Sequence, residues 1–187
     1  MSKPRSTAPS AFQRSPSPKT TLAYMGSIMS LFARGEETGG RFALMEFHSR
    51  PGNEPPPHVH EWEHELYYLL EGRMEFYCGD EILRIGTGEV AFLPQGKAHA
   101  FYIRSPVARA LILVHATGEQ AVGLDQYFID MGEPAASMEL PGHQATHVIS
   151  DPAHVTRVAA AHGIRILSPD ETIELLPHYP GFGIDPA

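Results

Sequence analysis

Four residues in the middle of the chain have types and spacing suited to holding a metal ion. His58 and His60 are separated by one residue, so on a β-strand both imidazoles would lie on the same face. Glu65 lies five residues after His60, and His99 follows on a later segment. Three imidazoles and one carboxylate suit a divalent transition metal ion and leave coordination positions open for water, oxygen or a substrate. The sequence therefore predicts one metal site formed by His58, His60, Glu65 and His99.

Composition and charge limit the classes of protein to which the chain can belong. Of its 187 residues, 42% are apolar, and no apolar stretch approaches the roughly 20 residues of a membrane span. The formal net charge of −8 argues against a nucleic-acid-binding protein, which would normally be basic. The single cysteine, Cys78, excludes an internal disulfide and favours a reducing compartment. We therefore expect a soluble, cytoplasmic protein that binds neither nucleic acid nor a membrane.

The elements that would position the four residues are short strands. Apolar and aromatic segments recur every 8–12 residues or so and are separated by turns rich in Gly, Pro and Asp, a pattern typical of a β-sandwich or barrel. The predicted fold class is all-β, with a short helical appendage at the C-terminal end. The expected strand segments are 21–32, 40–48, 65–70, 74–78, 81–85, 90–93, 99–103 and 107–115.

The chain divides into three predicted parts. Residues 1–20 contain four basic and no acidic residues, several serines and four prolines, and we expect a flexible N-terminal arm. Residues 21–118 form the β-domain, and residues 119–187 form a helical extension packed on it. Within this extension, Leu124, Phe128 and Met131 recur at helical spacing, and Asp151 followed by Pro152 is a typical helix start.

Two motifs resemble those of the cupin superfamily. The first runs glycine, five residues, His-x-His, three or four residues, Glu, six residues, glycine, and is matched by Gly52, His58, His60, Glu65 and Gly72. The second runs glycine, five residues, Pro-x-Gly, two residues, His, three residues, Asn, and is matched by Gly88, Pro94, Gly96 and His99, with Ile103 in place of the asparagine. The resemblance implies a jelly-roll β-barrel in which His58, His60, Glu65 and His99 bind the metal.

Three residues between His60 and Glu65 offer ligand atoms of the same types. They are Glu61, Glu63 and His64. Glu65 is the preferred ligand because six residues separate it from Gly72, as in the first motif. Glu61 and Glu63 are expected to be solvated.

Residues next to the predicted ligands would form the substrate site. If Glu65 and His99 face inward, alternation along their strands turns Tyr67 and Phe101 inward as well. The alternative is that these side chains only fill the barrel, since small barrels are packed by side chains. The candidate substrate-binding residues are Met45, Phe47, Tyr67, Met74, Phe76 and Phe101.

The layout of the chain also resembles, more weakly, bacterial quercetin 2,3-dioxygenase-like cupins. This resemblance implies a metal-dependent dioxygenase that uses O2 on a small aromatic or enolic substrate such as a flavonol, with Glu65 as the catalytic base. The ligand types accept iron, manganese, nickel, cobalt, copper or zinc. Two alternatives stay open: a metal-dependent isomerase or cyclase without oxygen, and a cupin that binds a small molecule without turnover. A homodimer is expected, because symmetric dimers are the commonest assembly.

Overall fold

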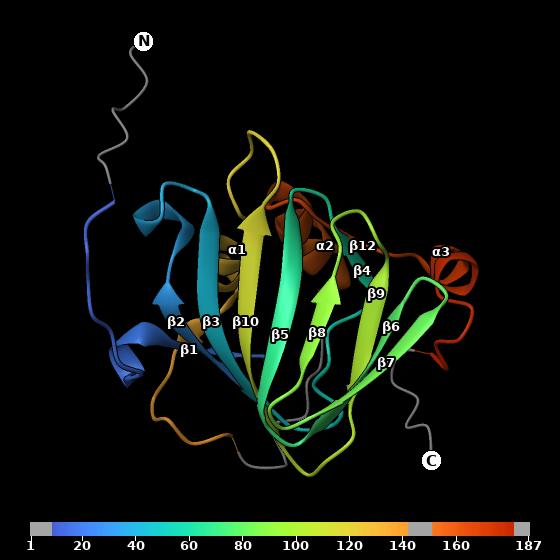
Figure 1. Ribbon diagram of the computed structural model, residues 1–187, viewed down its shortest axis with the longest axis horizontal. Coiled ribbons are helices and arrows are strands. Elements are labelled where there is room, and N and C mark those ends of the chain that lie inside the picture. Colours follow the sequence, from blue (N-terminus) through green and yellow to red (C-terminus); the bar gives the residue numbers. More distant parts are fainter. Residues whose placement is uncertain (1–8, 142–150, 182–187) are drawn as a thin grey trace.

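The protein is a two-layer β-structure with helices on one side (Figure 1). The computed structural model describes residues 9–141 and 151–181. The strands in these ranges are β1 (Thr21–Tyr24), β2 (Ser27–Ala33), β3 (Phe42–Ser49), β4 (His58–His60), β5 (Glu63–Glu71), β6 (Arg73–Cys78), β7 (Glu81–Gly86), β8 (Val90–Leu93), β9 (His99–Ile103), β10 (Ala108–Ala116), β11 (Glu133–Pro134) and β12 (Ile164–Ile166). The helices are α1 (Leu124–Met131), α2 (Pro152–Ala161) and α3 (Pro169–Leu175), and two 3-10 turns are η1 (Pro18–Thr20) and η2 (Gly35–Glu37).

The strands pair into two antiparallel sheets. The larger sheet has seven strands in the order β11-β1-β2-β3-β10-β5-β8, and the smaller has five in the order β12-β4-β9-β6-β7. The sheets resemble a jelly roll but stay separate instead of closing into a continuous barrel. The predicted all-β jelly roll with C-terminal helices is therefore confirmed, without the closure that the word barrel implies.

The larger sheet buries one face, because its long central strands alternate. Burial changes residue by residue along β3, β5 and β10, as expected for an antiparallel sheet with one face on the core. On β5 the buried series contains Glu63, Glu65, Tyr67 and Leu69. Glu65 and Tyr67 therefore lie on the same inward face of β5, as the alternation predicted.

Three strands of the smaller sheet, β4, β6 and β9, are buried on both faces, whereas the edge strand β7 is largely exposed. Every residue of β4 and β9 is buried, and so is every residue of β6 after Arg73. One face lies against the larger sheet, and C-terminal residues after α2 cover the other, including Leu167 and Leu176. Polar residues on the inner face of this sheet are thereby removed from solvent.

Two turns show how local conformation sets the strand boundaries. The expected segment 21–32 is a hairpin, because Met25 and Gly26 adopt φ of 49° and 76° and reverse the chain between β1 and β2. Methionine rarely adopts this conformation, so no clear hairpin pattern is present in the sequence there. Gly72, between β5 and β6, has φ of 94°, and a Cβ there would lie 2.4 Å from the carbonyl oxygen of Val107.

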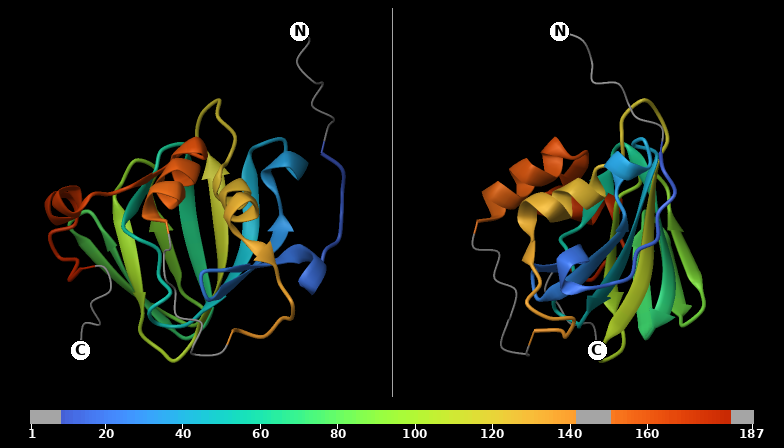
Figure 2. Two further views of the ribbon diagram at one scale, coloured as in Figure 1. Left: turned by 180° about the vertical axis from the view of Figure 1, so that it is seen from behind. Right: turned by 90° about the vertical axis from the view of Figure 1, so that its left-hand side faces the viewer.

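The C-terminal part contributes strands as well as helices. Both helices expected there are present as α1 and α2, and Asp151 caps α2 by accepting a hydrogen bond from the His154 amide. In addition, β11 pairs with β1 at the edge of the larger sheet, and β12 pairs with β4 at the edge of the smaller one. Figure 2 shows α1 and α2 together behind the face of the larger sheet that is seen in Figure 1.

The N-terminal segment is described from residue 9. Its Arg14 donates hydrogen bonds to both carboxylate oxygens of Glu37, at 2.8 and 2.5 Å. Residues 1–8 of the predicted arm, and 142–150 and 182–187 of the predicted extension, lie outside the described residues. No helix in the described ranges combines the length and apolar character needed to cross a bilayer.

Candidate metal centre

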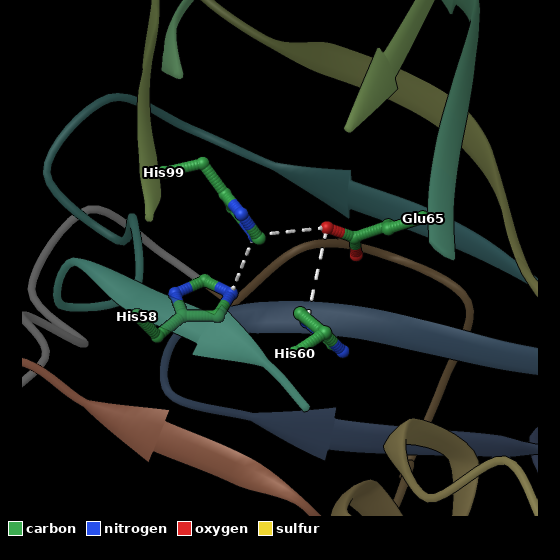
Figure 3. Close-up of side chains that lie close together, drawn as sticks. All are labelled: His58, His60, Glu65 and His99. Atoms are coloured by element: carbon green, nitrogen blue, oxygen red, sulfur yellow. Dashed lines mark hydrogen bonds and ion pairs between the residues drawn. The ribbon is translucent and has the colours of Figure 1, made fainter. Parts of the chain in front are cut away.

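The four predicted ligands lie together in the interior. His58 and His60 come from β4, Glu65 from β5 and His99 from β9, and all four are buried. One ligand atom from each can be chosen so that all four atoms lie within 4.8 Å of one another. Figure 3 shows the four side chains directed toward one another from these strands. They form a cluster that could hold one metal ion.

Strand pairing explains why the histidines meet. β4 follows the proline-rich residues 55–57 and is only three residues long, so alternation places His58 and His60 on its inner face and Val59 on its outer face. In the register between β4 and β9, His58 lies opposite His99. The inner positions of two neighbouring strands therefore supply all three imidazoles.

Hydrogen bonds determine which nitrogen of each imidazole is free. Nδ1 of His58 lies 2.8 Å from the carbonyl oxygen of Pro56, Nδ1 of His99 lies 3.0 Å from that of Lys97, and Nδ1 of His60 lies 2.8 Å from Oε1 of Glu63. Carbonyl and carboxylate oxygens only accept, so each Nδ1 carries the hydrogen and donates it. In the neutral ring Nε2 then carries a lone pair, which is the tautomer that a metal-binding histidine uses.

The Nε2 atoms are crowded in a way that favours a cation. Nε2 of His58 and Nε2 of His99 are 3.1 Å apart, and Nε2 of His99 lies 3.3 Å from Oε2 of Glu65. Nε2 of His60, 3.8 Å from the same oxygen, has no hydrogen-bond partner within residues 9–141 and 151–181, and neither does Oε2 of Glu65. Burying such atoms without a partner is costly, and a metal ion would satisfy all of them. The donor set and its geometry therefore fit a divalent ion.

The electrostatics of the cluster keep a negative charge on Glu65. Burial raises the pKa of Glu65, but His60, His99 and His58 outweigh it and lower the pKa to about 2. Burial lowers the pKa of His58 well below its usual range, and neighbouring His99 and His60 lower it further. Burial lowers the pKa of His60 too, but Glu65 and Glu63 more than compensate and raise it. A metal ion would therefore meet an ionised carboxylate and, at His58, a neutral imidazole.

An apolar cavity of about 50 Å³ adjoins the cluster. His58 and Glu65 form part of its wall, so the candidate ligands are accessible from it. Of the six residues proposed to bind substrate, Phe47, Tyr67 and Phe101 line the cavity. Met45, Met74 and Phe76 are not among its lining residues and instead pack in the core between the sheets.

Much of the cavity wall comes from residues that were not proposed from the sequence. From the N-terminal hairpin it includes Tyr24, whose hydroxyl lies 2.5 Å from that of Tyr127 on α1. Burial and contact with Tyr127 raise the pKa of Tyr24. The C-terminal part supplies Leu124, Tyr127, Phe128, Ile164 and Ile166. Helical periodicity predicted α1, but nothing in the sequence showed which part of the β-domain the helix would contact.

Comparison with known proteins identifies the family. Residues 45–115 match the protein family described as "Cupin domain", and this range contains all four candidate ligands. The protein contains a cupin domain. The family resemblance that was inferred from the two motifs is therefore confirmed.

Individual relatives of this cupin are distant. The chain is 28% identical over 78 residues to quercetin 2,3-dioxygenase of Bacillus subtilis (strain 168), a match that covers 42% of this chain and 23% of that protein. The cupin thus corresponds to about a quarter of that enzyme's length. A predicted oxalate decarboxylase from Thermotoga maritima is 22% identical, with a TM-score of 0.46 over 49% of this chain and 81% of its own. KdgF from Halomonas sp. is 18% identical, with a TM-score of 0.44 over 50% of this chain and 82% of its own. At these TM-scores the two structures indicate nothing about activity.

The acidic residues near the cluster differ from expectation at one position. Glu61 is exposed, as expected, but Glu63 is 1% exposed, so the expectation that it is solvated was wrong. Glu63 shares the inner face of β5 with Glu65, which period-two alternation alone could have indicated. His64 points the other way, and its Nδ1 accepts a hydrogen bond from the amide of Gln95. Neither Glu63 nor His64 belongs to the four-residue cluster.

Proposed function

We propose that this cupin is a metal-dependent dioxygenase of a small aromatic or enolic substrate, with the ion held by His58, His60, Glu65 and His99. The observation that carries the proposal is the position of the four-residue cluster in the wall of an apolar, aromatic cavity. The match to quercetin 2,3-dioxygenase over 78 residues supports this choice within the cupins.

The cavity provides a surface for a flat, apolar molecule. Phe47, Tyr67 and Phe101 line it, with ring centroids 5.9 Å apart for Phe47 and Phe101 and 5.7 Å apart for Tyr67 and Phe101. Burial and the neighbouring Glu65 carboxylate raise the pKa of Tyr67 well above its usual range, so its phenol stays protonated. These rings bind the apolar part of the substrate and exclude water from the reacting atoms.

Glu65 is the proposed general base. A bound divalent ion supplies Lewis acidity, which lowers the pKa of a coordinated substrate hydroxyl. Oε2 of Glu65, which has no hydrogen-bond partner in the described residues, would accept that proton once it has left the ion. A carboxylate with a pKa of about 2 is a weak base, so proton transfer depends on this acidification.

The size of the cavity indicates which substrates would bind more readily. A volume of about 50 Å³ holds only a few water molecules. A flavonol therefore requires the side chains of the wall to move outward, and a β-diketone requires a smaller displacement. We propose that small enolisable diketones and flavonols are both accepted, with diketones bound more readily. The homodimer and the cytoplasmic location stay predictions.

The test is oxygen uptake by the metal-free protein after addition of iron, manganese, nickel, cobalt, copper or zinc in turn, against flavonols and β-diketones. We expect uptake that requires substrate and one or more of the metals, and that falls at least about 100-fold in His99→Ala, because a four-residue site loses one ligand. His64→Ala is the matched control, since His64 faces away from the cluster, and it should keep the activity of the unaltered protein.

Two outcomes would contradict the proposal. Stoichiometric metal binding without uptake for any substrate would leave the isomerase or cyclase and the non-catalytic binding protein as the remaining functions. Uptake that persists in His99→Ala would show that oxygen reacts elsewhere on the protein.

A further inference from the structure

Glu63 lies where three hydrogen-bond donors from two parts of the chain converge. Its Oε1 accepts from Nδ1 of His60 at 2.8 Å and from the amide of Leu124 at 3.2 Å. Its Oε2 accepts from the amide of Gly123 at 2.8 Å. Gly123 and Leu124 begin α1, so one buried carboxylate joins a candidate metal ligand to the N-terminus of a helix 60 residues further along the chain.

We infer that Glu63 is a positioning residue that couples the metal centre to helix α1. It holds the His60 imidazole in the tautomer that leaves Nε2 free, and it satisfies the first amides of α1. Occupation of the site by a metal ion and ordering of α1 therefore favour each other. The inference rests on the metal binding in the proposed function, but not on the dioxygenase reaction.

Close packing fixes the helix end of this link. A Cβ on Gly123 would lie 2.0 Å from the carbonyl oxygen of His162, so the start of α1 packs directly against the end of α2. Gly163, the next residue, has φ of 73°, and a Cβ there would lie 2.3 Å from the ring of Trp62, next to Glu63. The two backbone amides that bind Glu63 are therefore held in place by the packing around them.

The same helix forms a wall of the cavity. Leu124, Tyr127 and Phe128 of α1 line the cavity, and no other helix in the described residues contributes to its wall. His58 and Glu65 line it from the sheets. A shift of α1 changes the shape of the cavity, and a rotation of His60 changes the metal centre. Glu63 restrains both through one side chain, which is how a substrate that displaces α1 would be sensed at the ion.

A glutamine at this position cannot satisfy the three donors. If its amide oxygen takes the place of Oε1, its NH2 group faces the amide hydrogen of Gly123, and α1 loses a hydrogen bond. If the amide is turned around, the NH2 group faces Nδ1 of His60. His60 must then accept at Nδ1 and carry its hydrogen on Nε2, where it cannot bind a metal. Glu63→Gln changes few atoms and in either orientation weakens one end of the link, at the Gly123 amide or at His60.

Asp125 offers a matched control. It is also a buried carboxylate in the first turn of α1, and its Oδ2 accepts from the amide of Gly35 at 2.8 Å. Asn at this position keeps an acceptor for Gly35, and no hydrogen bond of Asp125 to His60 occurs among the described residues. Asp125→Asn therefore removes a buried carboxylate from the start of α1 and leaves every hydrogen bond of Glu63 in place.

The experiment measures metal affinity by titration calorimetry for the unaltered protein, Glu63→Gln and Asp125→Asn. Amide hydrogen exchange at residues 123–128 is recorded with and without metal. We expect Glu63→Gln to weaken metal binding by about 10–100-fold and Asp125→Asn to change it less than about twofold. We expect metal to slow exchange at residues 123–128 in the unaltered protein and in Asp125→Asn, but not in Glu63→Gln.

A third measurement uses only the unaltered protein. The 15N shifts of the His60 ring in the metal-free, unaltered protein should show hydrogen on Nδ1; hydrogen only on Nε2 would overturn the inference. Equal metal affinity of Glu63→Gln and the unaltered protein would overturn it as well. No metal binding by the unaltered protein would instead overturn the proposed function, which separates the two failures.

Discussion

The two faces of the smaller sheet differ in how their polar side chains find hydrogen-bond partners, although the same strands supply both faces. The inner face contains His58, His60 and His99, with Phe76 and Phe101 beside them. The outer face contains Val59, Tyr77, Ala100 and Tyr102, covered by Leu167, Leu176 and Tyr179 from the C-terminal part. Alternation along β4, β6 and β9 separates the two sets.

The outer face satisfies its polar groups internally. Tyr179 stacks on Tyr102 with ring centroids 5.2 Å apart, and the Tyr77 hydroxyl donates to Glu75 at 2.5 Å. Glu75 also accepts from Arg84 at 2.6 Å and pairs with Arg104. On the inner face, Nε2 of His60 has no hydrogen-bond partner among the described residues, and neither does Oε2 of Glu65, which faces it from β5 of the larger sheet. The outer face therefore stabilises the fold by itself, whereas the inner face has buried polar atoms that a metal ion could satisfy.

The largest expected effect is a loss of folding stability when a side chain that covers the outer face is truncated. Leu176 is 1% exposed in the cluster that covers Val59, so Leu176→Ala should lower the free energy of unfolding by about 2–5 kcal/mol. Its metal affinity should change less than twofold, because no candidate ligand loses a contact. Urea unfolding and calorimetric titration of the same samples measure both. A large loss of metal affinity at unchanged stability would contradict the separation of the faces.

The next largest expected effect is stabilisation by metal, which depends on the inner face alone. Metal at 100 times its Kd should raise the free energy of unfolding of the unaltered protein by about 2.7 kcal/mol, because only the folded state holds the ion tightly. In His99→Ala the same metal concentration should give no increase, and the metal-free protein should lose no more than about 2 kcal/mol. Thermal unfolding with and without metal provides the measurement. Equal metal stabilisation of both proteins would mean that the ion binds elsewhere.

The smallest effect is the pH dependence of the outer face. Burial raises the pKa of Glu75, but Arg104, Tyr77 and Arg84 outweigh it, so the folded pKa lies below the usual value. The contribution is therefore fully present above the unfolded pKa of about 4.3 and is lost as pH falls through the folded pKa. Glu75→Gln should remove up to about 1 kcal/mol of the stability lost on acidification below pH 4.3. Unfolding curves of the metal-free protein across this range test it, and identical acid sensitivity of both proteins would contradict it.

Local spacing was enough to find the four-residue cluster and the β-strands around it. His58 and His60 share a face because strand side chains alternate, and the distances from Glu65 to Gly72 and from Gly96 to His99 follow a family pattern. The strand and helix positions depended on the same short-range rules. β12 could not be predicted, because three residues carry too little periodicity and the strand forms by pairing with the edge of β4.

The sequence by itself determined which residues could bind a metal and that the surrounding fold is a β-sandwich of short strands, because both depend on neighbours a few residues apart. Only the tertiary structure decided that Glu63 joins His60 to α1, and that α1 and β12 close the cavity. It also decided that Nε2 of His60 and Oε2 of Glu65 lack hydrogen-bond partners among the described residues, whereas Glu75 and Tyr77 on the outer face have them. The physical reason is that burial and hydrogen bonding here join residues about 60 or more positions apart, such as Glu63 and Gly123, whose proximity no local period encodes.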